Sequence, residues 1–286
     1  MIDEPPLSLS VLQSPSGPAA QARPADLIRV AGLSVTMGQG AKRQVVLSHI
    51  DFAVPEGAFV CLIGPSGCGK STLLKVLAGL VEPTSGTVSV AGLAPGEAAR
   101  QSQIGLVFQD ANLLPWKSAL DNAAFLLGVT HKSLPRAELR ARAQAMLSLV
   151  GLGESGHKRP NELSGGMRQR VSIARALALD PRVLLMDEPF GALDAITREA
   201  MTGSLLEIWE RTGKTIVFVT HSIDEAVMLA SQVHVMGIRP GRIVQTVEIG
   251  LAYPRDEGLP ETAEFGQYKR RLRRALQASH EPGAVA

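Results

Sequence analysis

The 286-residue sequence has almost no net charge, few cysteines and no long apolar run, and each of these absences excludes a class of protein. The formal net charge of +2 gives no overall electrostatic case for a nucleic-acid partner. No apolar run approaches the length that a membrane-spanning helix needs. The first residues, Met-Ile-Asp-Glu-Pro-Pro, are acidic where a secretory signal would be basic. A disulfide between the two cysteines, Cys61 and Cys68, would clamp a glycine-rich loop, so we expect reduced thiols and a soluble intracellular protein.

The composition favours one large domain with an appendage. Hydrophobic residues make up 45% and charged residues 20% of the chain, which suffices for a sizeable core. Residues 1–26 are rich in Pro, Ser and Ala without periodicity, which predicts a disordered N-terminal tail. We expect an α/β domain over 27–250 and a C-terminal helical extension over 251–286.

Short apolar runs alternate with stretches of helical periodicity along the domain. This alternation indicates a mainly parallel sheet covered by helices on both faces. The predicted strands are 27–35, 45–54, 59–63, 87–90, 104–108, 183–186, 215–219, 233–236 and 243–247, and the predicted helices follow residue 72 and cover 119–150 (broken near 134–135), 167–179, 195–211, 224–230 and 261–278.

The most informative stretch, residues 64–72, reads Gly-Pro-Ser-Gly-Cys-Gly-Lys-Ser-Thr and fits the P-loop pattern G-x-x-x-x-G-K-[ST]. A predicted strand precedes it and a predicted helix follows, which disfavours the alternative of a glycine-rich turn that binds nothing. Its glycines allow backbone N–H groups to surround a phosphate at a helix N-terminus. Lys70 can reach the outer phosphates, and the Ser71 hydroxyl can bind Mg²⁺. The predicted ATP-binding residues of this loop are Gly64, Pro65, Ser66, Gly67, Cys68, Gly69, Lys70, Ser71 and Thr72.

Two acids, Asp187 and Glu188, follow the apolar run 183–186. The carboxyl end of a parallel strand lies at the ligand crevice, so Asp187 can hold Mg²⁺ opposite Ser71. Glu188 is then free to orient and deprotonate a water aimed at the γ-phosphate. The alternative is an ordinary acidic turn before Pro189, and the P-loop in the same chain argues against it.

Residues 163–169, Leu-Ser-Gly-Gly-Met-Arg-Gln, open a helix with a serine cap and two glycines, which provides a second phosphate-facing group of N–H donors. The alternative is a helix cap with no further role. This heptad resembles the signature motif of ATP-binding cassette (ABC) ATPases. The resemblance extends over residues 27–247, with the motifs in the family's order. It implies a P-loop NTPase ABC ATPase fold, with a RecA-like core, an antiparallel β subdomain and an α-helical subdomain.

The resemblance also assigns roles to single residues. Gln109 is similar to the Q-loop glutamine, which senses Mg²⁺ and water and links to the transport partner. Asp194, in Ala-Leu-Asp, is similar to the D-loop that crosses a dimer interface. His221 resembles the switch histidine that contacts the γ-phosphate and Glu188, although a histidine after an apolar strand is often only structural. The resemblance thus implies Lys70, Gln109, Glu188 and His221 as catalytic residues and Ser71, Gln109 and Asp187 as metal ligands.

In one place the sequence departs from the family. Family members usually stack an aromatic residue on adenine, and Met37 stands at that position. Methionine can still pack against a purine, so we expect Met37 to contact the base more weakly than tyrosine would.

The resemblance further implies a head-to-tail homodimer. Two ATP molecules would lie between the Lys70 loop of one chain and Ser164, Gly165 and Gly166 of the other. The pair would close on ATP with Mg²⁺ and open after hydrolysis.

Residues 108–118, 186–194 and 197–198 are similar to those of importer ATPases of the nitrate/sulfonate/taurine type. The expected function is that of an ATPase energising uptake of a small anionic solute through separate integral membrane permease subunits. A periplasmic or extracellular solute-binding protein would be an indirect partner, and the chain would lie on the cytoplasmic side of the inner (plasma) membrane. The alternative, a soluble ABC protein acting on nucleic acid or ribosomes, usually has two fused cassettes or a long coiled-coil insertion, and this sequence has neither.

Two surface features allow two interpretations each. Residues 113–116, Leu-Leu-Pro-Trp, either present an apolar surface to a helix of a membrane subunit or bury Trp116 in the helical subdomain. The predicted helix 261–278 carries five basic residues and either lies on anionic lipid or presents a solvated face.

Overall fold

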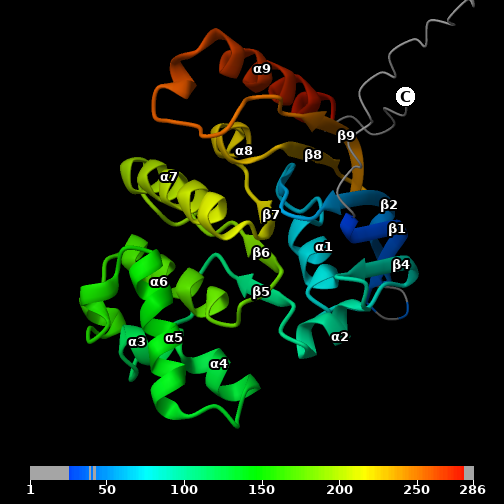
Figure 1. The fold of residues 1–286 in the computed structure, drawn as a ribbon. Helices are drawn as coiled ribbons and strands as arrows, with labels where there is room; N and C mark the ends of the chain where they lie inside the picture. The colour runs from blue at the N-terminus through cyan, green and yellow to red at the C-terminus, as the bar shows by residue number, and fades with distance from the viewer. Residues whose placement is uncertain (1–25, 39, 41–42, 280–286) are drawn as a thin grey trace, which may run out of the picture.

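Two sheets of different kinds organise the chain in the computed structural model, which describes residues 26–38, 40 and 43–279 (Figure 1). The larger has six strands in the order β5-β6-β7-β3-β8-β9, parallel except for the antiparallel pair β8 and β9. The smaller is antiparallel, in the order β2-β1-β4. The strands are β1 (Asp26–Met37), β2 (Gln44–Pro55), β3 (Phe59–Ile63), β4 (Ser85–Val90), β5 (Ile104–Val107), β6 (Val183–Asp187), β7 (Thr215–Val219), β8 (Gln232–Gly237) and β9 (Arg242–Glu248).

The helices divide between a lobe of their own and the faces of the larger sheet (Figure 1). They are α1 (Lys70–Leu77), α2 (Pro95–Arg100), α3 (Ala119–Ala123), α4 (Phe125–Thr130), α5 (Arg136–Leu149), α6 (Gly165–Leu177), α7 (Ala195–Thr212), α8 (Ile223–Leu229) and α9 (Ala263–Ala278), with 3₁₀ turns η2 (Gly153–Ser155), η3 (Pro160–Glu162) and η4 (Leu259–Glu261). No helix among the described residues is long and apolar enough to cross a membrane.

Strand β3 is buried on both faces and separates two hydrophobic cores. Phe59, Cys61 and Ile63 point into the core shared with α6, α7, α8 and α9. Val60 and Leu62 point into the core shared with α1 and the antiparallel sheet. Side chains alternate across a strand, so a continuous apolar run is what a strand between two layers requires. The predicted layered fold is therefore confirmed, with the antiparallel sheet on the same face as α1.

A short loop follows β5 and leads into the helical lobe formed by α3, α4, α5 and α6. Buried Asn122 fixes this loop, because its side-chain amide donates to the Leu114, Lys117 and Ser118 carbonyls and its oxygen accepts from the Leu114 amide. Trp116, at the tip of the loop, is 69% exposed. The interpretation that buried Trp116 inside the helical subdomain is wrong.

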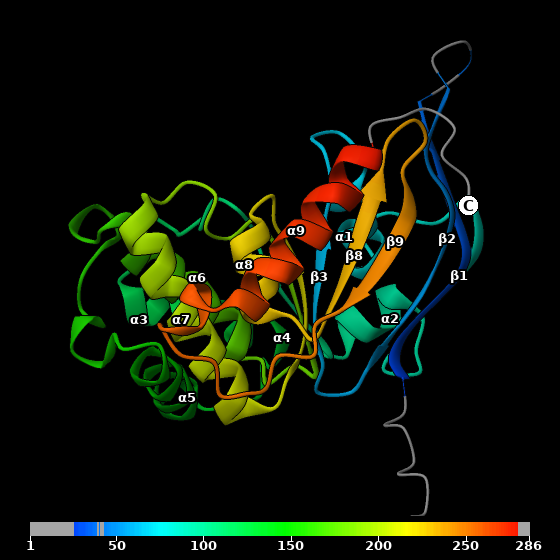
Figure 2. The ribbon, with the colours of Figure 1, turned by 90° about the horizontal axis from the view of Figure 1, so that it is seen from above.

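The C-terminal extension is held to the larger sheet by α9, which lies against α8 and β8 (Figure 2). Its apolar side chains Phe265, Leu272 and Ala275 are buried there. The same apolar face would have to enter lipid for the helix to lie on a membrane, so the structure favours the solvated basic face. Strand β1 begins at Asp26, the last residue of the predicted tail, and the rest of that tail lies outside the described residues.

Candidate active site

The glycine-rich loop lies between β3 and α1, at the carboxyl end of a central parallel strand. At two positions of this loop, Gly64 and Gly69, the structure leaves no room or no favourable backbone conformation for another residue. A Cβ on Gly64 would come within 2.7 Å of the Met236 carbonyl oxygen. Gly69 has φ 96°, a left-handed conformation that L side chains rarely adopt, and precedes the first residue of α1. The loop thus turns its N–H groups toward a helix N-terminus, the arrangement that binds phosphate.

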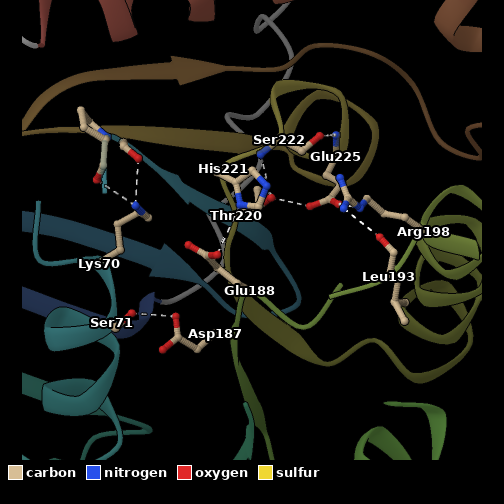
Figure 3. Close-up of polar contacts among 12 residues, drawn as sticks. Lys70, Ser71, Asp187, Glu188, Leu193, Arg198, Thr220, His221, Ser222 and Glu225 are labelled. Carbon is tan, nitrogen blue, oxygen red and sulfur yellow. Dashed lines mark hydrogen bonds and ion pairs between the residues drawn. The ribbon is translucent and has the colours of Figure 1, made fainter. Parts of the chain in front are cut away.

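Lys70 is nearly buried, at 6% exposed, and its ammonium group is held by the loop itself. Nζ donates to the carbonyl oxygens of Gly64 at 2.8 Å and Pro65 at 3.1 Å (Figure 3). These bonds compensate for the cost of burying the charge and keep Nζ over the loop. Cys68 and Cys61 are buried free thiols, and burial raises the pKa of each.

Ser71 and Asp187 converge from α1 and β6, as the sequence predicts. Ser71 Oγ donates to Asp187 Oδ1 at 2.9 Å (Figure 3). Burial raises the pKa of Asp187, while the bond from Ser71 opposes that rise. A hydroxyl and a carboxylate are hard oxygen donors that suit Mg²⁺. No group of three or more His, Cys, Asp or Glu side chains that could hold a metal alone was found in the described part of the chain.

Glu188 and His221 face each other at the ends of β6 and β7. His221 Nδ1 lies 3.3 Å from Glu188 Oε2 (Figure 3). Glu188 has φ 45°, which turns it out of the strand direction, and its amide donates to the Val219 carbonyl at 3.0 Å. The structure thus brings the predicted base and the predicted switch histidine together.

Gln109 follows β5 and lies beside the turn that carries Glu188. A Cβ on Gly191 would meet Gln109 Nε2 and the Glu188 carbonyl oxygen, each at 3.3 Å. The Gln109 amide therefore lies close to the turn that follows Glu188.

Ser164, Gly165 and Gly166 form a second group together with the loop before α7. Ser164 caps α6 by accepting from the Met167 amide at 3.3 Å. A Cβ on Gly165 would lie 3.3 Å from Leu193 Cδ2, and one on Gly166 would lie 2.8 Å from Thr197 Cγ2. Asp194 caps α7 by accepting from the Thr197 amide at 2.9 Å, and that bond lowers the pKa of Asp194.

Met37, Asp194 and the set 164–166 are also predicted to bind ATP, and in the described part of the single chain none of them is bonded to the P-loop. Met37 ends β1 and is 38% exposed. No hydrogen bond or ion pair among the described residues connects Met37, Asp194 or the set 164–166 to the P-loop. Sequence reasoning also missed Arg198, Thr220 and Glu225, which Figure 3 shows beside the site. The available signal was Glu225, an acid on the apolar face of the helix predicted over 224–230.

A phosphate-binding loop, a serine–aspartate pair and a glutamate–histidine pair at the carboxyl ends of parallel strands define the class of P-loop nucleoside triphosphatases. Similarity to known proteins identifies the family within this class. The model of the ABC transporter family matches residues 47–191. The chain belongs to the ABC transporter family, and it is an ATP-binding, ATP-hydrolysing component of such a transporter.

Curated relatives and solved structures agree with this assignment. The chain is 44% identical over 245 residues to the taurine import ATP-binding protein TauB of Rhizobium johnstonii, covering 84% of this chain and 92% of that protein. It is 45% identical over 227 residues to the nitrate import ATP-binding protein NrtD of Synechococcus elongatus, covering 79% and 82%. A dimeric post-hydrolysis structure of the ATP-binding cassette MJ0796, bound to ADP and Pi, matches with TM-score 0.69 at 32% identity, covering 79% and 100%. The cbiO1 structure from Clostridium perfringens matches with TM-score 0.70 at 26% identity, covering 88% and 98%.

Proposed function

We propose that this chain is the ATP-hydrolysing subunit of an importer, which energises uptake of a small anionic solute through separate membrane subunits. The observation that carries the proposal is the grouping of Lys70, Ser71, Asp187, Glu188 and His221 at one edge of the parallel sheet. The taurine and nitrate import relatives support a nitrate, sulfonate or taurine-like solute.

Lys70 and the loop glycines bind and orient the ATP phosphates. Lys70 Nζ exchanges its two carbonyl partners for phosphate oxygens, and the loop N–H groups donate to the same phosphates. Ser71, Asp187 and Gln109 would hold Mg²⁺. That ion, when bound, neutralises charge on the phosphoryl groups.

Glu188 orients the attacking water and accepts its proton. His221 keeps the Glu188 carboxylate in place through the Nδ1–Oε2 contact, and its other ring nitrogen would contact the outer phosphate of bound ATP. A general base of this kind accelerates proton transfer by about 10²–10⁴-fold.

The second group, around Ser164, Gly165 and Gly166, completes the site of another chain. Figure 1 places α6 in the helical lobe and α1 beside the antiparallel sheet. One chain thus carries two phosphate-binding surfaces in separate lobes, and a head-to-tail pair of chains would bring each P-loop opposite the partner's α6. The dimeric cassette bound to ADP and Pi supports this pairing.

The loop around Trp116 is the proposed contact for the membrane subunits. Trp116 stands exposed beside an open groove of about 590 Å³, whose lining includes Lys117, Phe125 and Val129. An aromatic residue next to a partly apolar groove fits a helix from a membrane protein. In this proposal the chain would lie on the cytoplasmic face of the inner (plasma) membrane, beside its membrane subunits.

The test uses the complex with the membrane subunits encoded beside this gene. Uptake of taurine, alkanesulfonates and nitrate is measured in vesicles loaded with ATP, and the neighbouring solute-binding protein identifies the solute. We expect transport of one of these anions, lost in Glu188→Gln. Transport that persists in Glu188→Gln would refute the proposal.

The contact with the membrane subunits has its own variant. We expect Trp116→Glu to leave the ATPase activity of the isolated subunit within about twofold and to abolish assembly, because a charge in an apolar contact stays desolvated without a partner. Leu80→Glu, at a 60% exposed position outside the groove, is the control and should assemble normally. Normal assembly of Trp116→Glu would refute the groove as the docking site.

A further inference from the structure

A series of polar contacts runs from the loop before α7 to the residue preceding His221, and the nucleotide chemistry above uses none of its members (Figure 3). It begins at Arg198, one turn into α7. Arg198 Nη2 donates to the Leu193 carbonyl oxygen at 2.9 Å, and Nε lies 3.8 Å from Glu225 Oε1. One guanidinium therefore faces both the loop that ends at Asp194 and the carboxylate of α8.

The series continues through Thr220. The second Glu225 oxygen accepts from Thr220 Oγ1, which in turn accepts from the Ser222 amide at 2.9 Å. Thr220 is 2% exposed and Glu225 7% exposed. The hydroxyl of Thr220 thus fixes the backbone on both sides of His221, whose ring contacts Glu188.

The backbone closes these contacts into a ring. Glu188 and Leu193 are joined by a tight turn, in which the Gly191 amide donates to the Glu188 carbonyl at 3.0 Å and the Leu193 amide to the Phe190 carbonyl at 3.1 Å. Phe190 anchors the turn against the core residue Phe218. Leu193 is thus connected to Glu188 along the backbone and to the residues on either side of His221 through side chains.

Burial makes this arrangement costly. Burial raises the pKa of Glu225, while Thr220 and Arg198 favour its charged form. Arg198 Nε is buried and has no hydrogen-bond partner among the described residues. Its 3.8 Å separation from Glu225 is beyond hydrogen-bonding distance, and an approach of less than about 1 Å would complete the bond. Closing this gap would give the buried Nε donor the hydrogen-bond partner that it lacks, and a buried donor without a partner costs free energy.

We propose that Arg198, Glu225 and Thr220 are positioning residues that couple the loop at Leu193 and Asp194 to His221 and Glu188. This rests on the proposed function, in which that loop lies against the second chain. Docking of the second chain on the loop closes the Arg198–Glu225 contact and holds His221 in its existing contact with Glu188, so that the rate of hydrolysis depends on pairing.

The experiment measures ATP turnover in four variants of the full chain. Thr220→Val keeps the side-chain shape and removes the hydroxyl, whereas Thr220→Ser keeps the hydroxyl. Arg198→Met removes the charge, whereas Arg198→Lys keeps it. We expect kcat to fall about 10–100-fold in the Val and Met variants, the effect of a misplacement near 1 Å, with KM for ATP within about threefold. Thr220→Ser should recover most of the turnover.

Two further measurements separate positioning from a structural role. ATP-driven dimerisation, measured in the Glu188→Gln background, should stay within about threefold in Arg198→Met and Thr220→Val. The double variant should lose no more than about threefold beyond the worse single variant, because both interrupt the same path. Arg182→Met, which breaks the exposed ion pair with Glu56, is the control and should keep its turnover.

Turnover within twofold of wild type in both Thr220→Val and Arg198→Met would overturn the inference. The inference would also be overturned if Thr220→Val and Thr220→Ser lost kcat to the same extent and melting temperature to the same extent. The Thr220 hydroxyl would then contribute nothing to turnover. A wild-type chain that hydrolyses no ATP would instead refute the proposed function.

Discussion

The two loops proposed to hold the nucleotide differ in how much of their structure one chain supplies. The P-loop follows a strand whose five residues are all buried, and Lys70 is held by two carbonyls of the loop itself. The loop at Ser164 lies at the surface, where the serine hydroxyl accepts from one amide and the first turn of α6 leaves N–H groups without helical partners.

This difference separates two tasks. The first loop is organised by its own core, so under the proposed function it would bind phosphate in a single chain. The second would present its N–H groups to a nucleotide held by another chain. Damage to the first should therefore abolish binding, and damage to the second should spare binding and abolish hydrolysis.

The largest expected effect comes from Lys70→Met. Loss of the buried ammonium should weaken ATP binding by about 10²-fold and turnover by at least about 10²–10³-fold, because Lys70 Nζ is held over the loop where it would neutralise the outer phosphates. Lys75→Met, on the exposed face of the same helix, is the control. Calorimetric titration and steady-state hydrolysis measure the two quantities. If Lys70→Met bound ATP as tightly as the natural protein, the P-loop would not differ from the Ser164 loop in its importance for ATP binding.

Gly165→Asp tests the second loop. The new Cβ meets the flexible ends of two side chains, Leu193 Cδ2 at 3.3 Å and Arg168 Nη2 at 3.9 Å, and an acid suits the first turn of a helix, so the fold should be kept. Its charge would repel phosphate, so we expect turnover to fall about 10–100-fold with ATP binding to the single chain unchanged. Gly203→Asp, where a Cβ meets nothing within 4 Å, is the control. Weakened binding in the single chain would show that both loops hold the same nucleotide in one molecule.

Met37→Tyr tests whether residue 37 contacts the adenine base of ATP bound at the P-loop. A ring stacked on the base should add about 1 kcal/mol, which is about a fivefold gain in ATP affinity. Met37→Leu is the control, being apolar and similar in size without a ring. Equal affinities of the tyrosine and methionine proteins would exclude Met37 from the adenine contact.

The smallest expected effect is on the stability of the fold at low pH. His234 pairs with Leu62 across β8 and β3, next to the P-loop, and burial lowers its pKa from 6.5 to about 4. The unfolded chain therefore binds the extra proton first as pH falls. The stability contributed by neutral His234 is complete above pH 6.5 and is lost progressively down to about pH 4.

Between pH 7.5 and 5.5 this loss amounts to about 1.4 kcal/mol of unfolding free energy. Burial raises the pKa of Asp187 and Glu225, which acts in the opposite direction, so the comparison must be made against His234→Leu. Urea unfolding at the two pH values gives the difference. Equal acid sensitivity of the two proteins would exclude His234 as its source.

The sequence predicted the layers and the P-loop group because local patterns determine both. Strand β3 occupies the residues expected of it, since five apolar residues before a glycine loop allow one placement. Helix α2 was missed, because Pro95-Gly96 is typical of a turn and the helix has only six residues. The stretch 119–150 divides at Ala124 as well as before Pro135, and no residue near Ala124 signals a break.

The remaining features depend on tertiary contacts. The exposure of Trp116 follows from Asn122, which holds its loop from another element. Arg198 and Glu225 are 27 positions apart on helices that only the packed sheet brings together, so no spacing in the sequence announces their pairing.

The left-handed backbone conformation of Glu188 costs stability at a residue that the proposed function requires for activity. A left-handed conformation costs an L side chain roughly 1–2 kcal/mol, a cost that glycine escapes. Glu188→Gly should therefore be inactive and yet melt no lower than the natural protein. Under the proposed function, the strained backbone at Glu188 is the cost of holding its carboxylate out of line with the strand, where it can accept a proton from water.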